Sequence, residues 1–524
     1  MNSPMLASAK KGATNMPPFK RKHLAAALVG VMLAVPAFAA DPSQAELLKE
    51  MRRLSERMEK LEARNAELEK KAQTSPAKPE GELAQRVKAL EENNARMDSA
   101  LDSDRLSEKD PEVVTRLKDI EFRTLSMQKQ ARTIESLEGI TASGSLVMVG
   151  QRANKSAIAA GDAGSALNYR GDVAVTLPGG EIGNAEGHIF AQFRLGQGNG
   201  LALNNTLTGT PNSTAFQLTN RDDSTALLAQ AWYQLDIPLP FGGHKPHSRE
   251  HLEINFGKID PFVFFDQNAA ADDESAKFLN NAFVHNPLLD SGGDAGVDAY
   301  GFTPGVRIAY HNETDKPEWW KASLGVFGAG NGAAYERSFS SPFVIGQLEF
   351  GRKFSGGLDG TYRLYAWRNG QSTAYQNEFD TAIERHSGWG ASIDQRVGDA
   401  TTVFGRYGKN LNGNVRFDQT LTAGAEFGGN YWSRSADAVG AALGWLRTSQ
   451  NFRDNSATLD VDADATPDFG YTASGSEQLL EIYYRMRLNE KLELTPDFQL
   501  IRQPGGDKTA SAAKVVGLRV KASF

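Results

Sequence analysis

The spacing of apolar residues divides the chain into two regions of different period. Between residues 47 and 138 apolar residues recur in alternating steps of four and three, which is the heptad spacing of a coiled-coil seam; the first of them are Leu47, Met51, Leu54, Met58 and Leu61. Proline cannot continue a helix without losing a hydrogen bond, so Pro76, Pro79 and Pro111 interrupt the seam. The pattern predicts a coiled-coil region over residues 40–138, with breaks near 73–81 and 110–111.

A seam this narrow cannot bury enough surface alone, so its helices must pair with other copies or fold back on one another. Asn65 and Asn94 fall at a positions of the heptad, where a buried amide fixes register and oligomer number. We expect self-association, with a parallel homotrimer preferred to a dimer. The alternative is that both asparagines lie on an exposed polar helix surface.

After Gly139 the period changes to two, which is typical of strands with one face in lipid and the other in water. The last segment shows this most clearly, because Val516, Leu518, Val520, Ala522 and Phe524 alternate with Val515, Gly517, Arg519, Lys521 and Ser523. The edge of a soluble sheet is the alternative. The same alternation recurs at residues 480–488 and 492–500, and more weakly at 189–195, 227–235, 252–256, 344–350 and 439–445.

The 385 residues from Ile140 to Phe524 suffice for about 16 to 18 strands joined by turns and loops. We therefore predict an all-β transmembrane antiparallel barrel over residues 139–524, preceded by the α-helical coiled coil. A barrel of that width holds water. An even number of strands puts both barrel ends on the same side, so the coiled coil would project into the periplasm of a Gram-negative envelope.

The N-terminus has the pattern of an export signal. Lys20, Arg21 and Lys22 precede an apolar run from Leu24 to Val35, and Ala37-Phe38-Ala39 has the small-x-small form of a cleavage site. That run is shorter than the roughly 20 residues that span a bilayer. We expect residues 1–39 to be a removable signal peptide; a short buried helix is the alternative.

Composition excludes several classes of protein. Removal of residues 1–39 takes away five positive charges and no acidic ones, so the formal net charge changes from −7 to −12, which does not favour nucleic acid. Cysteine is absent, so disulfides and thiolate chemistry are excluded. Asp460, Asp462 and Asp464 have the spacing of a calcium loop, but Ala465 and Tyr471 replace its glycine and glutamate, so we expect an acidic surface loop. No catalytic motif stands in a fitting context; we predict no enzyme, no cofactor and no metal site.

Residues 257–290 fit neither a strand nor a simple turn, and their apolar side chains need a wall to pack against. We expect a loop folded into the barrel lumen; an ordinary packed extracellular loop is the alternative. Several runs here and near the C-terminus resemble the carbohydrate-selective porins of the OprB family: residues 256–260 (FGKID), 265–268 (FDQN), 273–280 (DESAKFLN), 481–485 (EIYYR), 494–501 (LTPDFQLI) and 504–506 (PGG).

The resemblance implies an outer-membrane channel through which sugars and other small solutes diffuse passively. For pore-lining residues we select inward positions of the alternating strands, namely Arg485, Arg487, Arg519, Glu481, Tyr483, Arg194, Arg363 and Arg406. We expect Asp266, Gln267 and Asn268 at the constriction. For each residue the alternative is a solvated wall position that only sets the field of the pore. The rival functions are a general or anion-permeable porin, and a porin whose coiled coil tethers the outer membrane to cell-wall peptidoglycan.

Overall fold

The computed structural model describes residues 139–208, 210–216, 223–244, 247–290, 295, 300–354 and 357–524. The predicted signal peptide over residues 1–39 and the predicted coiled coil over residues 40–138 lie outside the described residues.

Strands make up most of the described chain. Sixteen of them follow one another in this part of the sequence: β1 (Thr141–Ala153), β2 (Ser165–Ile182), β3 (Ala185–Gln197), β4 (Thr225–Leu239), β5 (Glu250–Ile259), β6 (Thr303–Asn312), β7 (Trp319–Phe327), β8 (Phe343–Phe354), β9 (Leu358–Thr373), β10 (Ile383–Arg396), β11 (Thr401–Asn412), β12 (Phe417–Gly428), β13 (Ala438–Thr448), β14 (Ser476–Arg487), β15 (Leu492–Arg502) and β16 (Ala513–Ser523).

Helices are short and lie in the connections. They are the α-helices α4 (Asn281–Val284) and α5 (Gln450–Asn455) and the 3-10 turns η1 (Lys155–Ala157), η2 (Pro261–Val263), η3 (Gly330–Ala334), η4 (Ala374–Gln376), η5 (Gly429–Trp432) and η6 (Pro504–Gly506). Within the described residues, none of these helices has the length and apolar character needed to cross a membrane.

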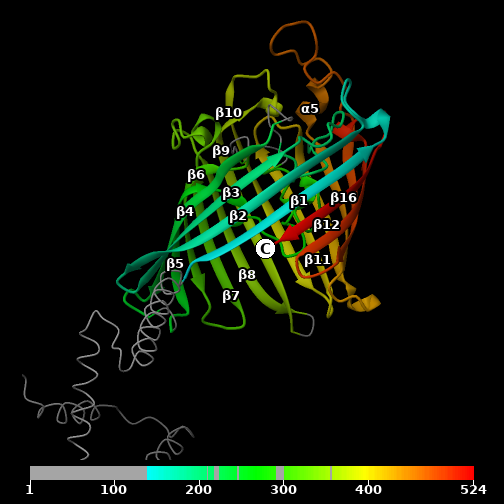
Figure 1. The fold of residues 1–524 in the computed structure, drawn as a ribbon. Helices are drawn as coiled ribbons and strands as arrows, with labels where there is room; N and C mark the ends of the chain where they lie inside the picture. Colours follow the sequence, from blue (N-terminus) through cyan, green and yellow to red (C-terminus); the bar gives the residue numbers. More distant parts are fainter. Residues whose placement is uncertain are drawn as a thin grey trace, which may run out of the picture. The chain divides into compact units, whose positions relative to one another are not determined.

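The strands close into one antiparallel barrel in which each strand pairs with its neighbours in sequence (Figure 1). β1 and β16 complete the closure with a continuous register from Ser145–Ser523 to Ala153–Val515. The predicted antiparallel barrel is confirmed, with a strand number at the lower end of the expected range. We call the end where β1 begins and β16 ends the turn rim, and the opposite end, which carries most of the long connections, the loop rim.

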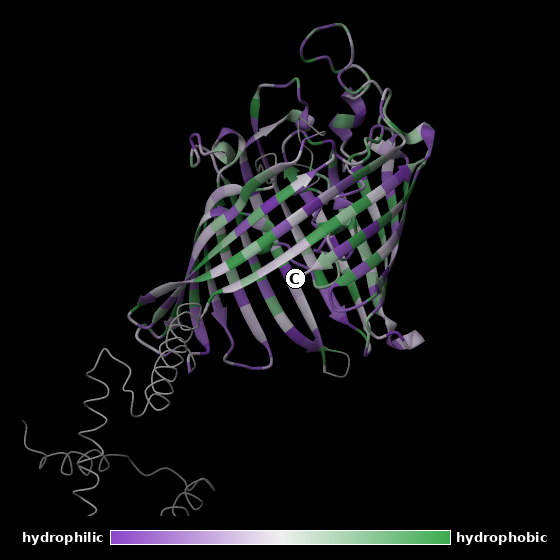
Figure 2. Cartoon of the chain, in the orientation of Figure 1, coloured by the Kyte–Doolittle hydropathy of each residue, from purple (hydrophilic) through white to green (hydrophobic). Residues whose placement is uncertain are grey.

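Apolar and polar residues alternate along the strands (Figure 2). On β16, Val516 and Leu518 point outward and are 55% and 45% exposed, whereas Val515 and Arg519 point inward and are 0% and 1% exposed. The outer surface of a membrane barrel has no water to bond to, so every backbone N–H and C=O group must hydrogen-bond to a neighbouring strand, and a closed barrel provides this. The apolar side chains that point outward contact lipid. The final segment therefore has the orientation that its sequence predicts.

One boundary differs from the sequence expectation. Residues 257–259, assigned from the sequence to the long loop, belong to β5, where Lys258 pairs with Ala231 of β4. Gly257 has φ +143°, and a Cβ there would lie 2.2 Å from the carbonyl oxygen of Ala231. This close approach needs glycine. Because Gly257 interrupts the alternation of apolar and polar residues, the sequence pattern does not show that the strand continues to Ile259.

Candidate functional site

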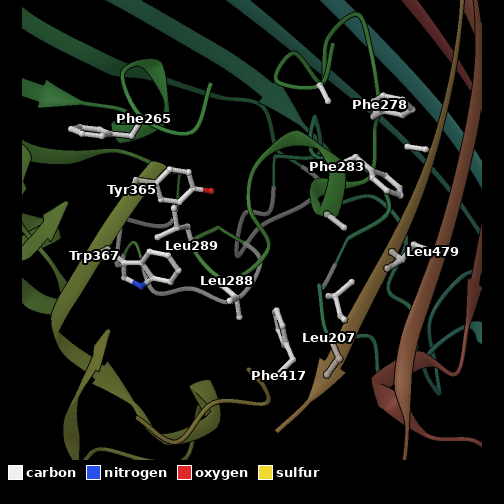
Figure 3. Close-up of a cluster of buried hydrophobic side chains, with 14 of the residues drawn as sticks. Leu207, Phe265, Phe278, Phe283, Leu288, Leu289, Tyr365, Trp367, Phe417 and Leu479 are labelled. Carbon is white, nitrogen blue, oxygen red and sulfur yellow. The ribbon is translucent and has the colours of Figure 1, made fainter. Parts of the chain in front are cut away.

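The connection between β5 and β6 folds into the barrel. We call its described part, residues 260–290, the inward loop. Its apolar side chains Phe265, Phe278, Phe283, Leu288 and Leu289 are buried and pack against the inner faces of β9, β11, β13 and β14 (Figure 3). Each buried phenylalanine contributes about 1.5–3 kcal/mol relative to exposure. The prediction of a loop folded into the lumen is confirmed.

Asp266 is the main polar attachment of the inward loop to the wall. Its Oδ1 accepts hydrogen bonds from the Tyr365 hydroxyl (2.8 Å) and from Arg406 Nε (3.2 Å), and its Oδ2 accepts one from the backbone N–H of Asn286 (2.5 Å). Arg406 also donates to the backbone oxygens of Asp266 (3.0 Å) and Phe283 (2.7 Å). Asp266 and Arg406 are 0% and 2% exposed, so the pair lies in a dry environment and depends on these mutual bonds.

The middle of the loop is held by the last strands. Glu481 of β14 accepts hydrogen bonds from the backbone N–H groups of Leu279 (2.6 Å) and Asn280 (3.0 Å). Arg519 of β16 donates to the backbone oxygens of Glu274 (3.0 Å) and Lys277 (2.7 Å). The wall charges thus satisfy backbone groups that a loop buried inside a barrel would otherwise leave unpaired.

A second connection, between β3 and β4, also enters at the loop rim. The backbone oxygen of Pro211 accepts from Gln151 of β1 (3.1 Å) and Gln499 of β15 (2.8 Å). The N–H of Ser213 donates to the backbone oxygen of Leu279 (2.8 Å). This segment therefore bonds to the inward loop on one side and to β1 and β15 of the wall on the other.

The eight residues selected from the sequence all lie on the inner face, in two environments. Arg406, Glu481, Tyr483 and Arg519 are covered by the inward loop and are at most 2% exposed. The others bond to neighbouring side chains of the wall: Arg194 to Asp172, Arg363 to Glu349 and Asp394, Arg485 to Glu426, and Arg487 to Glu493. Arg485 belongs to both environments, because it also donates to the backbone oxygen of Ala276 in the inward loop (3.4 Å).

The three residues expected at the constriction lie on the wall side of the inward loop. Asp266 takes part in the attachment described above, and Asn268 donates to the backbone oxygen of Ile393 on β10 (2.9 Å). The side chain of Gln267 donates to the backbone oxygen of Val263 within the loop, and the backbone oxygen of Gln267 accepts from the Ser392 hydroxyl (3.1 Å). These contacts fix the position of the loop in the lumen.

Beside the inward loop, polar side chains form a connected row on β2, β3 and β4, and one of them, Gln230, accepts from the backbone N–H of Asp260 (3.2 Å). We call Asp172, Gln192, Arg194 and Gln230 the polar ladder. Asp172 Oδ1 accepts from Arg194 Nε (2.7 Å) and Gln192 Nε2 (2.9 Å), and Gln192 Oε1 accepts from Gln230 (2.7 Å). The side chains of Arg194 and Asp172 are 17% and 15% exposed, so the ladder offers both donors and acceptors to the lumen.

Aromatic rings adjoin the ladder. Trp232 donates from Nε1 to Gln230 (3.3 Å), stacks on Phe190 at 4.8 Å between ring centroids, and meets Phe264 of the inward loop edge-on at 5.6 Å. Sequence reasoning selected Arg194 here but missed Asp172, Gln192, Phe190 and Trp232, because it concentrated on arginine. The signal was available, since residues 188–194 and 230–236 place polar or aromatic residues at alternate positions.

Two titratable groups of the inward loop, Asp260 and His285, lie on either side of Phe262: Asp260 accepts from its backbone N–H (2.9 Å), and the His285 ring stacks on its ring at 4.0 Å. Burial raises the pKa of Asp260 to about 6, and the charge of His285 opposes that shift only in part. Burial lowers the pKa of His285, but its hydrogen bond with Asp290 (2.8 Å) and the charge of Asp290 outweigh burial, so the pKa lies above its ordinary value. Asp260 therefore changes charge around pH 6, and His285 keeps its positive charge to a higher pH than an ordinary histidine.

Acidification should make the lumen more favourable to anions. As pH falls from 8 to 5, Asp260 loses its negative charge around pH 6. Protonation of His285, which its raised pKa favours, changes the charge in the same direction. The reversal potential under a salt gradient should shift toward anion selectivity with a midpoint near pH 6. Asp260→Asn should show part of the shift already at pH 8. An unchanged reversal potential between pH 8 and pH 5 would contradict this assignment.

A closed barrel with a polar inner face, narrowed by a loop from its own wall, defines the class of porins. A family model described as "Carbohydrate-selective porin, OprB family" matches residues 189–524, which is more than half of the chain. The chain belongs to that family. Among curated protein sequences, none matches it significantly.

One solved structure supports the fold, and others are similar at lower scores. The high-pH structure of OprB from Pseudomonas putida is 17% identical, covers 75% of this chain and 96% of its own, and has a TM-score of 0.58. A loop-deleted OmpT, an outer membrane protein of Vibrio cholerae, is 12% identical over 74% of this chain and 99% of its own, with a TM-score of 0.43. A mutant of Rh. blastica porin is 9% identical over 74% of this chain and 100% of its own, with a TM-score of 0.39.

Proposed function

We propose that this chain is an outer-membrane porin through which carbohydrates and other small solutes diffuse passively, moving down their gradient without energy coupling. The observation that carries the proposal is the polar ladder with its adjoining aromatic rings, beside a loop that narrows the lumen of a barrel in the carbohydrate-selective porin family. A sugar presents hydroxyl groups that need donors and acceptors, and ring faces that suit aromatic side chains.

In this proposal, the solute contacts those residues of the inner face that the inward loop leaves accessible. Arg194 and Asp172 supply a donor and an acceptor in one ion pair, and Phe190 and Trp232 supply a flat apolar surface. Arg487 and Arg363 set the charge of the remaining lumen, whereas Arg406, Glu481, Tyr483 and Arg519 act by holding the loop. Arg485 does both, because it pairs with Glu426 and donates to the backbone oxygen of Ala276 in the loop (3.4 Å). The Asp266–Asn268 segment lies on the wall side of the loop and sets the width of the passage by holding the loop in position.

Sugar block of ion conductance tests the proposal. With the full mature chain in planar bilayers, a panel of mono- and disaccharides should reduce the open-channel conductance in a saturable way. Loss of a charged hydrogen bond costs about 1.5–3 kcal/mol, so Arg194→Ala should weaken the block roughly 10- to 100-fold. Arg396→Ala, which removes the same charge at the end of β10, should leave the block intact. Conductance indifferent to every sugar would refute carbohydrate passage.

For the N-terminal region we propose, from the heptads alone, a periplasmic coiled coil that assembles the barrel as a homotrimer. Tethering of the outer membrane to peptidoglycan is the second role that the same arm fits. Deletion of residues 41–138 distinguishes them: loss of trimers on gel filtration supports assembly, whereas intact trimers in a fragile envelope support tethering. Intact trimers and an intact envelope would refute both.

A further inference from the structure

Two histidines and a glutamate meet on the inner wall near the turn rim. His251 and Glu253 lie two residues apart on β5 and therefore share its inner face, and His311 of β6 pairs directly with His251. The two imidazole rings stack with centroids 4.5 Å apart and an interplanar angle of 15°. One donor atom from each of the three side chains lies within 4.8 Å of the other two.

The distances within this cluster suit a shared metal ion. Glu253 Oε1 lies 3.0 Å from His311 Nε2 and 3.5 Å from His251 Nε2. Ligands that bind Zn²⁺ at 2.0–2.2 Å in a tetrahedral arrangement lie about 3.3 Å from one another. Both oxygen–nitrogen distances fall close to that value.

A hydrogen bond does not account for the contact of His311. Its Nε2 atom is buried and makes no hydrogen bond, although it is only 3.0 Å from the carboxylate oxygen. Because buried polar atoms in proteins are normally hydrogen-bonded, a buried nitrogen without a hydrogen bond, beside a carboxylate and a second imidazole, favours an ion that all three side chains share.

The surroundings prepare Glu253 for that role. Arg307 Nη1 donates to the other carboxylate oxygen, Oε2 (2.8 Å), and to Asn255 Oδ1 (2.8 Å). This leaves Oε1 directed at the two imidazoles, in the way that outer-shell partners orient metal ligands. The side chains of His251, Glu253 and His311 are 26%, 16% and 17% exposed, so lumen water can complete the coordination shell.

The geometry points to a site for a divalent transition-metal ion such as Zn²⁺, formed by His251, Glu253 and His311 on the lumen wall. Imidazole nitrogens and one carboxylate are a ligand set that suits Zn²⁺ and Cu²⁺ rather than Ca²⁺ or Mg²⁺. The three ligands stand on two paired strands of a closed sheet, so their backbone positions are fixed before the ion arrives. The two stacked imidazoles then need only rotate to direct their nitrogens at one ion. A bound metal ion adds positive charge to the lumen. This inference does not depend on the proposal that sugars pass through the barrel.

Zn²⁺ binding to the detergent-purified full chain tests the proposal, provided that the affinity tag contains no histidine. Calorimetric titration at pH 7.5 should show one saturable site in the wild type. His251→Asn with His311→Asn should weaken it at least roughly 100-fold, since removal of two ligands exceeds the 10- to 100-fold effect of losing an outer-shell partner. Glu253→Gln, which preserves size, should weaken it as well.

His244 and His247 provide the matched control, because they also lie near one another, in the turn between β4 and β5. His244→Asn with His247→Asn removes the same number of imidazoles and should leave the saturable site unchanged. Folding of every variant is checked by its heat-dependent mobility on gels. Wild-type protein without saturable Zn²⁺ binding would overturn the proposal, as would binding that persists in the His251/His311 variant or disappears in the His244/His247 variant.

Discussion

Replacement of Asp266 by alanine should release the inward loop and raise the single-channel conductance. The carboxylate is fully buried and receives hydrogen bonds from Tyr365, Arg406 and the backbone of Asn286. Removal of one partner of a buried ion pair costs about 3–5 kcal/mol, because Arg406 is left charged and unpaired. That penalty lowers the equilibrium constant for attachment of the loop by a factor of roughly 150 to 5,000. Electrical recordings in planar bilayers measure the result.

Two variants control this experiment. Asp266→Asn retains the size of the side chain and one acceptor oxygen but loses the charge that pairs with Arg406, so its conductance should lie between wild type and Asp266→Ala. Asp399→Ala removes a carboxylate from an exposed turn between β10 and β11 and should conduct as wild type does. If Asp266→Ala shows wild-type conductance and wild-type current noise, Asp266 does not hold the loop.

An arginine on the outer face of β9 should prevent stable insertion, whereas one on the inner face of the same strand should be tolerated. Leu364 points outward and is 51% exposed. Thr361, three residues earlier, points inward and pairs in register with Asp394, whose carboxylate bonds to Arg363. Arginine on the lipid face near the bilayer midplane costs about 2–4 kcal/mol, and on the water face it has no such cost.

Folding into lipid vesicles measures the difference between Leu364→Arg and Thr361→Arg. The first variant should show a lower folded fraction and a lower urea midpoint, and the second should match wild type. Equal loss of folding in both variants would mean that the two faces of the strand do not differ in solvent, and a larger loss in Thr361→Arg would reverse the assignment of inside and outside.

The barrel was predictable from sequence because strand alternation is a local property. Leu518 and Arg519 are neighbours, and a period of two places them on opposite faces wherever the strand ends. The same reasoning recognised the inward loop, since an apolar stretch without alternation must pack on something. It misplaced residues 257–259, because Gly257 breaks the alternation inside β5 through a backbone conformation that only the neighbouring strand explains.

The roles of individual inward residues could not be predicted, because they depend on contacts distant in sequence. Arg406 and Asp266 are 140 residues apart, and nothing in either segment indicates that the loop covers β11 instead of β3. Arg194 and Arg406 look alike in their strands, yet one faces the lumen and the other lies beneath the loop. The His251–Glu253–His311 cluster was not predicted for the same reason, because its third residue comes from β6, which follows β5 only after a long loop.

Thiol accessibility on β3 tests the water-lined interior of the barrel most directly. The sequence contains no cysteine, so a single introduced thiol reports only its own position. Gln192 belongs to the polar ladder, and its neighbour Phe193 points outward and is 52% exposed. In bilayers a charged, water-soluble thiosulfonate should modify Gln192→Cys and reduce its conductance, and should leave Phe193→Cys unmodified. Modification of Phe193→Cys together with protection of Gln192→Cys would contradict the account.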